Sequence, residues 1–196
     1  MGAGKIDLAE AQKIASEVLE HVRPAMARVE VAGSVRRQKP VVGDVELVGI
    51  PSCREKLVKL LGEVGQLIKP GVPGVIPWSP KANAKYIRVR LKQDMNMDVF
   101  LGRPENFGGL FVMRTGSGTG PDGNPFEGFV PGLFSRWKKL SKGGRMTDVM
   151  PTMPTGEQLW VEQEQDFFDL LDMNFVPPEA RTSKGVIKKY VKGTET

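Results

Sequence analysis

Apolar residues recur every three or four positions over residues 7–23, and this spacing predicts an amphipathic helix. Asp7, with Glu10 three positions later, is expected to cap its N-terminus, and Pro24 is expected to end it. The predicted apolar face consists of Leu8, Ala11, Ile14, Ala15, Val18, Leu19 and Val22. A second helix is predicted from Cys53 to about Val64 by the same criterion.

Short apolar runs predict β-strands in the same part of the chain. The predicted strands are 29–32, 45–50, 86–91 and 97–101. The second is almost continuously apolar, as in a buried strand, whereas the third alternates apolar residues with Arg88 and Arg90. Residues 69–81 are rich in proline and glycine and are expected to form an irregular loop. Helices and strands in this order predict an α+β fold, a mixed sheet with flanking helices.

The chain changes character after Ser117. Residues 118–125 are glycine- and proline-rich and form the clearest predicted hinge. We therefore expect one domain over residues 1–117 and a smaller C-terminal lobe over 118–196. Two further helices are expected in that lobe, at about 130–142 and 163–173.

Composition limits the chemistry. The chain has 196 residues with one cysteine and one histidine, so it cannot form an internal disulfide or a zinc site of the usual kind. Any metal would be a hard cation bound by carboxylates. No apolar stretch approaches the roughly 18 residues of a membrane-spanning helix, and the N-terminus lacks a secretory signal. These features favour an intracellular protein without a membrane partner.

The net charge is +5 and the sequence pI is about 9.3. Such a balance favours polyanionic partners, because neutralising phosphates releases condensed counterions. Nucleic acid is therefore one candidate partner.

Candidate chemistry concentrates between Val31 and Val48. Gly33-Ser34 directly follows a predicted strand, where backbone amides and a hydroxyl are free to approach an anion, and Arg37 adds a cation nearby. Asp44 and Glu46 are two positions apart on the next strand, so both carboxylates project from the same face. Two such carboxylates repel each other unless a divalent cation lies between them.

Asp98 is the best candidate for a third acid, because it lies on an apolar strand where an unpaired carboxylate would be costly. Three carboxylates beside a phosphate-binding turn are what phosphoryl transfer needs, since positioning and charge neutralisation dominate its catalysis. Two metal ions about 4 Å apart would stabilise the attacking and leaving oxygens together.

These motifs resemble a known family. Gly33-Ser34, then Asp44-x-Glu46 and a distant Asp98, is similar to the nucleotidyltransferase signature of the polymerase-beta superfamily, and within it to the family X DNA polymerases. Three further segments, over roughly 104–117, 135–143 and 165–181, resemble that family's sequence. The resemblance covers about residues 8–182 and implies a minimal catalytic palm-like domain with a thumb-like lobe.

The resemblance also implies a role for each matching residue. Asp44, Glu46 and Asp98 would bind two Mg²⁺ ions, which Mn²⁺ could replace, and Asp98 would accept the proton of the primer 3′-hydroxyl. Gly33, Ser34, Arg37 and the amide of Gly43 would bind the triphosphate. Thr115 and Gly116 would lie along the sugar, and Arg136 near the template strand.

The implied activity is template-directed addition of a deoxynucleoside triphosphate to a primer in gapped or nicked DNA, a repair reaction, by a monomer. The chain departs from the family at Glu46, where the polymerases usually have Asp, and at Met113 and Arg114, which replace the pair under the sugar. The choice between ribo- and deoxynucleotides therefore stays open. A virus is a plausible source for so small an enzyme.

Two alternatives remain. One is a template-independent nucleotidyltransferase acting on RNA ends or a small acceptor. The other is a non-catalytic DNA-binding module, which the intact set of acids disfavours.

Overall fold

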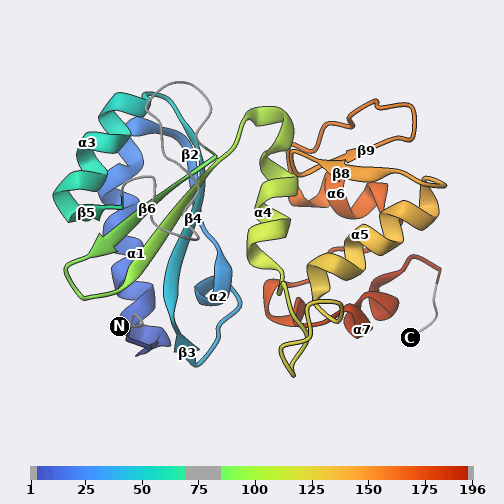
Figure 1. Ribbon diagram of the computed structural model, residues 1–196, viewed down its shortest axis with the longest axis horizontal. Helices are drawn as coiled ribbons and strands as arrows, with labels where there is room; N and C mark the ends of the chain where they lie inside the picture. The colour runs from blue at the N-terminus through green and yellow to red at the C-terminus, as the bar shows by residue number, and fades with distance from the viewer. Residues whose placement is uncertain (1–3, 69–84, 194–196) are drawn as a thin grey trace. The chain divides into compact units, whose positions relative to one another are not determined.

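The protein is an α+β protein with two compact units, Met1–Arg103 and Pro104–Thr196, called here the N-terminal and C-terminal units (Figure 1). The computed structural model describes residues 4–68 and 85–193. Each unit has a hydrophobic cluster of its own. The sequence predicts a domain over residues 1–117 and a smaller lobe over 118–196, and this division stays a prediction. The loop expected at 69–81 lies outside the described residues.

The N-terminal unit contains a five-stranded mixed sheet flanked by helices. Its elements are β1 (Ile6–Asp7), α1 (Leu8–Val22), η1 (Arg23–Ala25), β2 (Met26–Val31), α2 (Gly33–Arg36), β3 (Val41–Val42), β4 (Asp44–Pro51), α3 (Arg54–Val64), β5 (Gly65–Leu67), β6 (Tyr86–Leu91) and β7 (Asn96–Leu101). The strand order is β2-β4-β7-β6-β5, in which β4 and β7 are parallel and the other pairs antiparallel. β1 and β3 form a small separate ladder.

Local sequence explains the two long helices. The Asp7 side chain accepts a hydrogen bond of 2.9 Å from the Glu10 amide, so the predicted cap of α1 is confirmed. The buried residues of α1 are Ala11, Ile14, Ala15, Val18 and Val22, all from the predicted apolar face. The second predicted helix is confirmed as α3, with Cys53 in the capping position. Both helices lie on the same side of the sheet (Figure 1).

Alternation along the strands divides the sheet into two faces. Val45 and Leu47 of β4 and Val99 of β7 belong to the cluster that packs under α1 and α3. The intervening residues of the same strands, including Asp44, Glu46 and Asp98, project to the opposite face. The candidate acids therefore leave the sheet on the face that α1 and α3 do not cover.

The C-terminal unit is mainly helical. Its elements are η2 (Pro104–Asn106), α4 (Phe107–Thr115), α5 (Phe129–Leu140), β8 (Arg145–Thr147), β9 (Met150–Thr152), α6 (Glu164–Leu170), η3 (Pro178–Ala180), α7 (Lys184–Ile187) and η4 (Lys188–Tyr190). Its core is centred on Phe129, Leu133, Phe167 and Phe168, all fully buried. The predicted helix at 130–142 is confirmed as α5.

Arg181 is fully buried in this unit. Its Nε donates a hydrogen bond of 2.9 Å to the Val176 carbonyl, and its guanidinium pairs with Glu164. The guanidinium also lies over the Phe168 and Phe175 rings, with centroid distances of 5.1 and 5.3 Å. Arg181 therefore supports packing of the C-terminal segment.

Some sequence-based boundaries are corrected. The helix expected at 163–173 ends at Leu170, because Asp172 adopts a positive φ of 51°, which a continuing helix does not allow. The turn expected at Gly33-Ser34 is the first turn of the short helix α2. Among the residues described, no helix is long and apolar enough to cross a bilayer.

Candidate active site

The register of β4, β7 and β6 brings four charged residues together on one face of the sheet. β4 and β7 are paired in parallel, which places Glu46 opposite Asp98 and Asp44 opposite Asn96. β6 is antiparallel to β7, which places Arg88 opposite Asp98. Residues opposite each other in adjacent strands point to the same face, so these side chains form one polar cluster.

Asp98 is the most enclosed member of the cluster, with 4% of its surface exposed. Both of its carboxylate oxygens accept hydrogen bonds from Arg88, from Nε at 2.7 Å and from Nη2 at 2.7 Å. This fork-to-carboxylate geometry is the strongest form of a side-chain ion pair. The pair raises the pKa of Arg88 above its already high ordinary value, so Arg88 stays charged.

The pKa of Asp44 is raised above its ordinary value. Burial is the main cause, and the negative charge of Asp98 adds to it. The charges of Arg88 and Arg37 act in the opposite direction but do not cancel the effect. Asp44 therefore lies close enough to Asp98 for the two carboxylates to repel, as the sequence indicated for an acid cluster.

Glu46 is held against the start of α2. The Ala32 amide donates a hydrogen bond of 2.8 Å to the Glu46 carbonyl. Gly33 has a φ of +63°, and a Cβ atom placed on it would lie 2.0 Å from Oε2 of Glu46. Only glycine fits this close approach without displacing the carboxylate.

Ser34 and Arg37 lie on the turn next to these acids. The Ser34 hydroxyl oxygen is buried and has no hydrogen-bond partner among the described residues. A buried hydroxyl without a partner carries a desolvation cost that a bound oxygen atom would relieve. Burial lowers the pKa of Arg37, while the charges of Glu46 and Asp44 raise it, which places Arg37 within electrostatic reach of both acids.

Gly43 lies between β3 and β4, directly before Asp44. A Cβ atom at this position would have no neighbour within 4 Å. The space beside Gly43 is therefore open, which leaves its backbone approachable.

No group of three or more carboxylate, imidazole or thiolate side chains within residues 4–68 and 85–193 is arranged to hold a metal ion. In the same part of the chain, Arg88 hydrogen-bonds to both oxygens of Asp98, and the Glu46 carboxylate lies against Gly33. The metal-ligand roles of Asp44, Glu46 and Asp98 stay predictions. Their chemistry nevertheless suits a hard divalent cation, since all three offer carboxylate oxygens.

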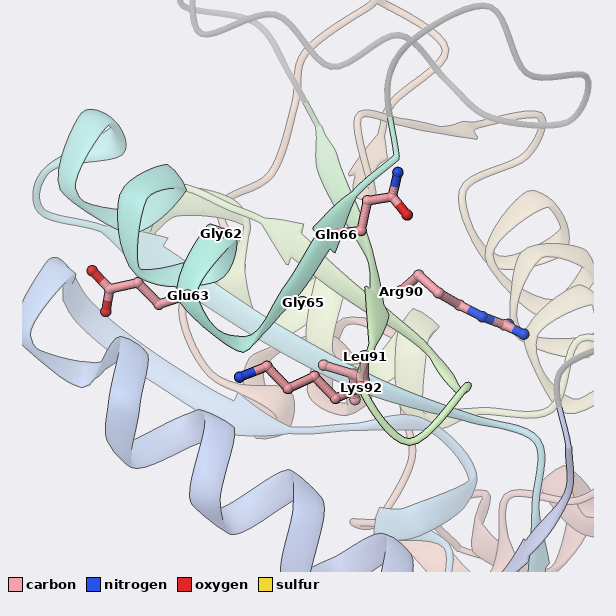
Figure 2. Close-up of a pocket in the computed structure, with 7 residues that line it drawn as sticks. All are labelled: Gly62, Glu63, Gly65, Gln66, Arg90, Leu91 and Lys92. Atoms are coloured by element: carbon pink, nitrogen blue, oxygen red, sulfur yellow. The ribbon is translucent and has the colours of Figure 1, made fainter.

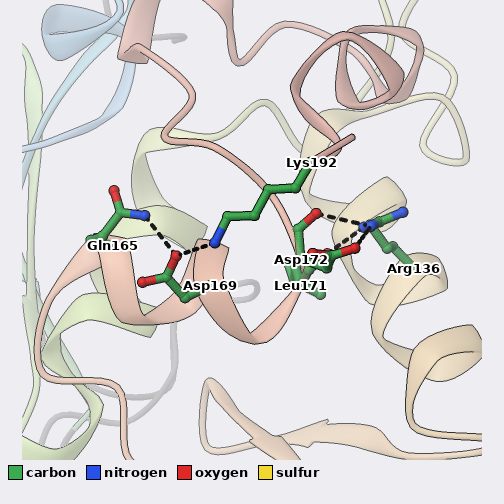
Figure 3. A network of polar contacts seen from close by, with 6 residues as sticks. All are labelled: Arg136, Gln165, Asp169, Leu171, Asp172 and Lys192. Atoms are coloured by element: carbon green, nitrogen blue, oxygen red, sulfur yellow. Dashed lines mark hydrogen bonds and ion pairs between the residues drawn. The ribbon is translucent and has the colours of Figure 1, made fainter. Parts of the chain in front are cut away.

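The other predicted site residues belong to the C-terminal unit. Thr115 is fully buried at the end of α4, and the Gly116 amide donates to the Val112 carbonyl at 2.8 Å. Arg136 of α5 donates hydrogen bonds to the Leu171 and Asp172 carbonyls after α6, and its guanidinium lies 3.8 Å from the Asp172 carboxylate (Figure 3). The roles expected of Thr115 and Gly116 along the sugar, and of Arg136 near the template strand, stay predictions.

Arg88 is the site residue that the sequence did not identify. In the sequence it is one polar position of an alternating strand. Its pairing with Asp98 depends on the register between β6 and β7. The sequence alone does not fix that register, because it depends on the geometry of the turn that joins the two strands.

A separate cavity of about 400 Å³ lies at the β5 edge of the sheet. Figure 2 shows it where α3 passes into β5, beside β6, with Glu63, Arg90 and Lys92 among its lining residues. It shares no residue with the acid cluster of β4 and β7.

Comparisons with known proteins leave the chain without a family assignment. A scan against protein-family models finds no match. A search of curated proteins finds no significantly similar sequence.

Proposed function

We propose that this chain is a metal-dependent nucleotidyltransferase of the family X DNA polymerase type, which adds a deoxynucleotide to a primer 3′-hydroxyl under template direction. One observation carries the proposal: Asp44, Glu46 and Asp98 share one sheet face next to the turn that bears Gly33 and Ser34. Gapped or nicked DNA and deoxynucleoside triphosphates are the proposed substrates.

The electrostatics of the cluster support a divalent cation. Burial and the charge of Asp98 both raise the pKa of Asp44, so ionising Asp44 costs more free energy than it does in water, and a bound cation would offset this cost. Asp44, Glu46 and Asp98 would hold Mg²⁺, or Mn²⁺ in its place. When bound, two such ions would neutralise charge on the transferring phosphate and on the attacking and leaving oxygens.

The chain's own residues have separate tasks in this proposal. The Ser34 hydroxyl and the Arg37 guanidinium bind phosphate oxygens, which gives the buried Ser34 Oγ a partner. The amide of Gly43 borders open space and adds a further donor. Asp98 accepts the proton of the primer hydroxyl on a carboxylate oxygen.

Arg88 is a positioning residue in this scheme. It fixes the plane of the Asp98 carboxylate through two hydrogen bonds. Each Asp98 oxygen accepts one hydrogen bond from Arg88 and keeps a second lone pair for a metal ion or a proton. Arg88 and the substrate can therefore share the same two oxygens.

The resemblance to family X DNA polymerases defines the finer expectations. Residues 1–117 would form the catalytic palm-like domain and residues 118–196 the thumb-like lobe, with Thr115 and Gly116 along the sugar and Arg136 near the template. Only the chain's resemblance to that family supports these roles.

The decisive experiment is primer extension on gapped DNA with each of the four template bases, supplied with ribo- or deoxynucleotides. We expect Mg²⁺-dependent extension that follows the template and is lost in Asp98→Asn. Untemplated addition would instead support the RNA-end or small-acceptor alternative. DNA binding without turnover under any divalent metal would support the non-catalytic alternative.

Asp94→Asn is the matched control. It makes the same chemical change on the β6–β7 turn of the same unit, at a side chain that is 78% exposed. Asn is also tolerated at the positive φ of 57° that residue 94 adopts. Equal activity of Asp98→Asn and Asp94→Asn would reject the proposed role of the acid cluster.

A further inference from the structure

A groove in the C-terminal unit lies between α5 and the segment formed by α7 and η4. It has a volume of about 410 Å³, which is within the usual range of about 300–1,000 Å³ for ligand pockets. Gly132 makes this arrangement possible: a Cβ atom there would lie 2.5 Å from Cδ1 of Ile187 and 2.7 Å from Cβ of Lys184. The short helix α7 therefore packs directly on the backbone of α5.

The groove is basic. Arg136 and Lys139 of α5 face Lys184 and Lys188 across it, and no acidic side chain is among its described lining residues. Lys184 pairs with Glu127, and Arg136 is bound to the carbonyls after α6. Lys139 and Lys188 are both exposed, so they are best placed to meet an incoming anion.

The groove also has an aromatic wall. Phe126 lines it and is 78% exposed, although large apolar side chains are normally buried. A hydrogen-bonded turn holds it there, because the Phe126 amide donates to Oδ1 of Asn124 at 2.9 Å. Ile187 and Val191 add apolar surface beside it.

Cations that line a groove next to an exposed aromatic ring are the combination that binds single-stranded nucleic acid, by phosphate contacts and base stacking. We propose that this groove binds a single-stranded nucleic-acid segment, with phosphates at Lys139 and Lys188 and one base stacked on Phe126. An acidic peptide would use the lysines but has no base to stack on Phe126. The overall charge of +5 favours the same partner.

This proposal deepens the proposed function and rests on it, because Arg136, one of the lining residues, is the residue proposed to lie near the template strand. It involves no residue of the acid cluster, and a binding assay without nucleotide or metal tests it independently of catalysis. Loss of polymerase activity in Asp98→Asn would leave the binding result unchanged.

The test is a fluorescence anisotropy titration of the full chain with a labelled oligothymidylate over a series of salt concentrations. In Lys139→Glu/Lys188→Glu we expect binding at least tenfold weaker. The slope of log Kd against log salt should fall by about 0.7 for each lost phosphate contact. In Phe126→Ala we expect binding about five- to hundredfold weaker, with the salt slope unchanged.

The matched control is Lys56→Glu/Lys59→Glu, which carries the same change of charge on exposed residues of α3. If the groove variants bind no more weakly than this control, the proposal is wrong. Phe126→Ala removes a side chain that is mostly in solvent, so this variant should fold. Its binding therefore still tests the proposal if the double variant does not fold.

Two other ligands complete the experiment. If oligoglutamate binds as tightly as oligothymidylate and Phe126→Ala affects neither, the groove is a general anion site and the proposal fails. If phosphatidylserine vesicles bind through Lys139 and Lys188 while oligothymidylate binding does not depend on them, the surface is a membrane site and the proposal also fails.

Discussion

At the scale of single residues, Asp44 shows how the acid cluster affects stability. Its pKa is raised in the folded protein by burial and by Asp98, relative to an ordinary value of 3.8. The folded state therefore holds the Asp44 proton more tightly than the unfolded state does. As the pH rises from about this ordinary value through the raised pKa, ionisation of Asp44 progressively lowers the free energy of unfolding.

Asp44→Asn should therefore increase thermal stability at neutral pH when no metal is added, because Asn cannot ionise. The difference in melting temperature between the variant and the wild type should shrink as the pH is lowered, because Asp44 is then protonated and residue 44 is neutral in both proteins. Melting temperatures measured across a pH series test this. Asp94→Asn serves as the control, because it makes the same substitution at a side chain that is largely in solvent. A gain that does not vary with pH would contradict the explanation.

The acid cluster could be predicted in part from the sequence. A spacing of two along a strand fixes Asp44 and Glu46 on one face whatever the rest of the chain does. The ion pair between Arg88 and Asp98 could not be predicted in the same way, because it depends on the alignment of two strands joined by a turn. The contact of Glu46 with Gly33 depends on tertiary packing and has no sequence pattern of its own.

At the scale of elements, the sequence predicts the long helices that have apolar residues at helical spacing. It does not predict helices that are very short or buried on most sides. α1, α3 and α5 carry apolar faces with helical spacing, and the sequence predicts them to within a few residues. α4 was not predicted as a helix, because most of it is buried and its two glycines lower helix propensity. α7 has only four residues, too few to show a period.

Packing of α7 on α5 leads to a prediction at this scale. Gly132→Ala should loosen α7, because the added Cβ has to displace Ile187 and Lys184. We expect faster hydrogen exchange at the amides of residues 184–190 and a modest loss of stability, on the order of 1–3 kcal/mol for overpacking.

Gly185→Ala is the matched control within α7 itself. A Cβ at Gly185 would have only the Ser183 hydroxyl nearby, at 3.8 Å. Ala in a helix interior is favoured over Gly by roughly 0.5–1 kcal/mol, so this variant should slow exchange in the same segment. Equal effects of the two substitutions would show that Gly132 is not needed for close packing.

At the scale of the whole molecule, the two units have separate hydrophobic clusters, centred on the five-stranded sheet and on α5 with α6. Separate cores allow each unit to lose its structure with its own free energy. The sequence indicated a second lobe from its glycine- and proline-rich hinge. The boundary of the compact units, between Arg103 and Pro104, depends on which side chains share a core, and the domain division expected after Ser117 stays a prediction.

Leu57→Ala and Leu133→Ala test this organisation, since both leucines are fully buried, one in each cluster. Each substitution should lower the free energy of unfolding of its own unit by about 2–5 kcal/mol. Hydrogen exchange followed by mass spectrometry should show the loss of protection mainly within the mutated unit. If either variant lowered protection equally in both, the two cores would unfold as one cooperative structure.

The contact between Gly33 and Glu46 has a consequence for how related sequences can diverge. With Glu at position 46, a side chain at position 33 would collide with Oε2 at 2.0 Å and with Cδ at 2.8 Å. A shorter acid at position 46 would not be enough to admit a side chain at 33, because the φ of +63° there strains any residue other than glycine. Glycine should therefore persist at position 33 during evolution whether the acid at 46 is Glu or Asp.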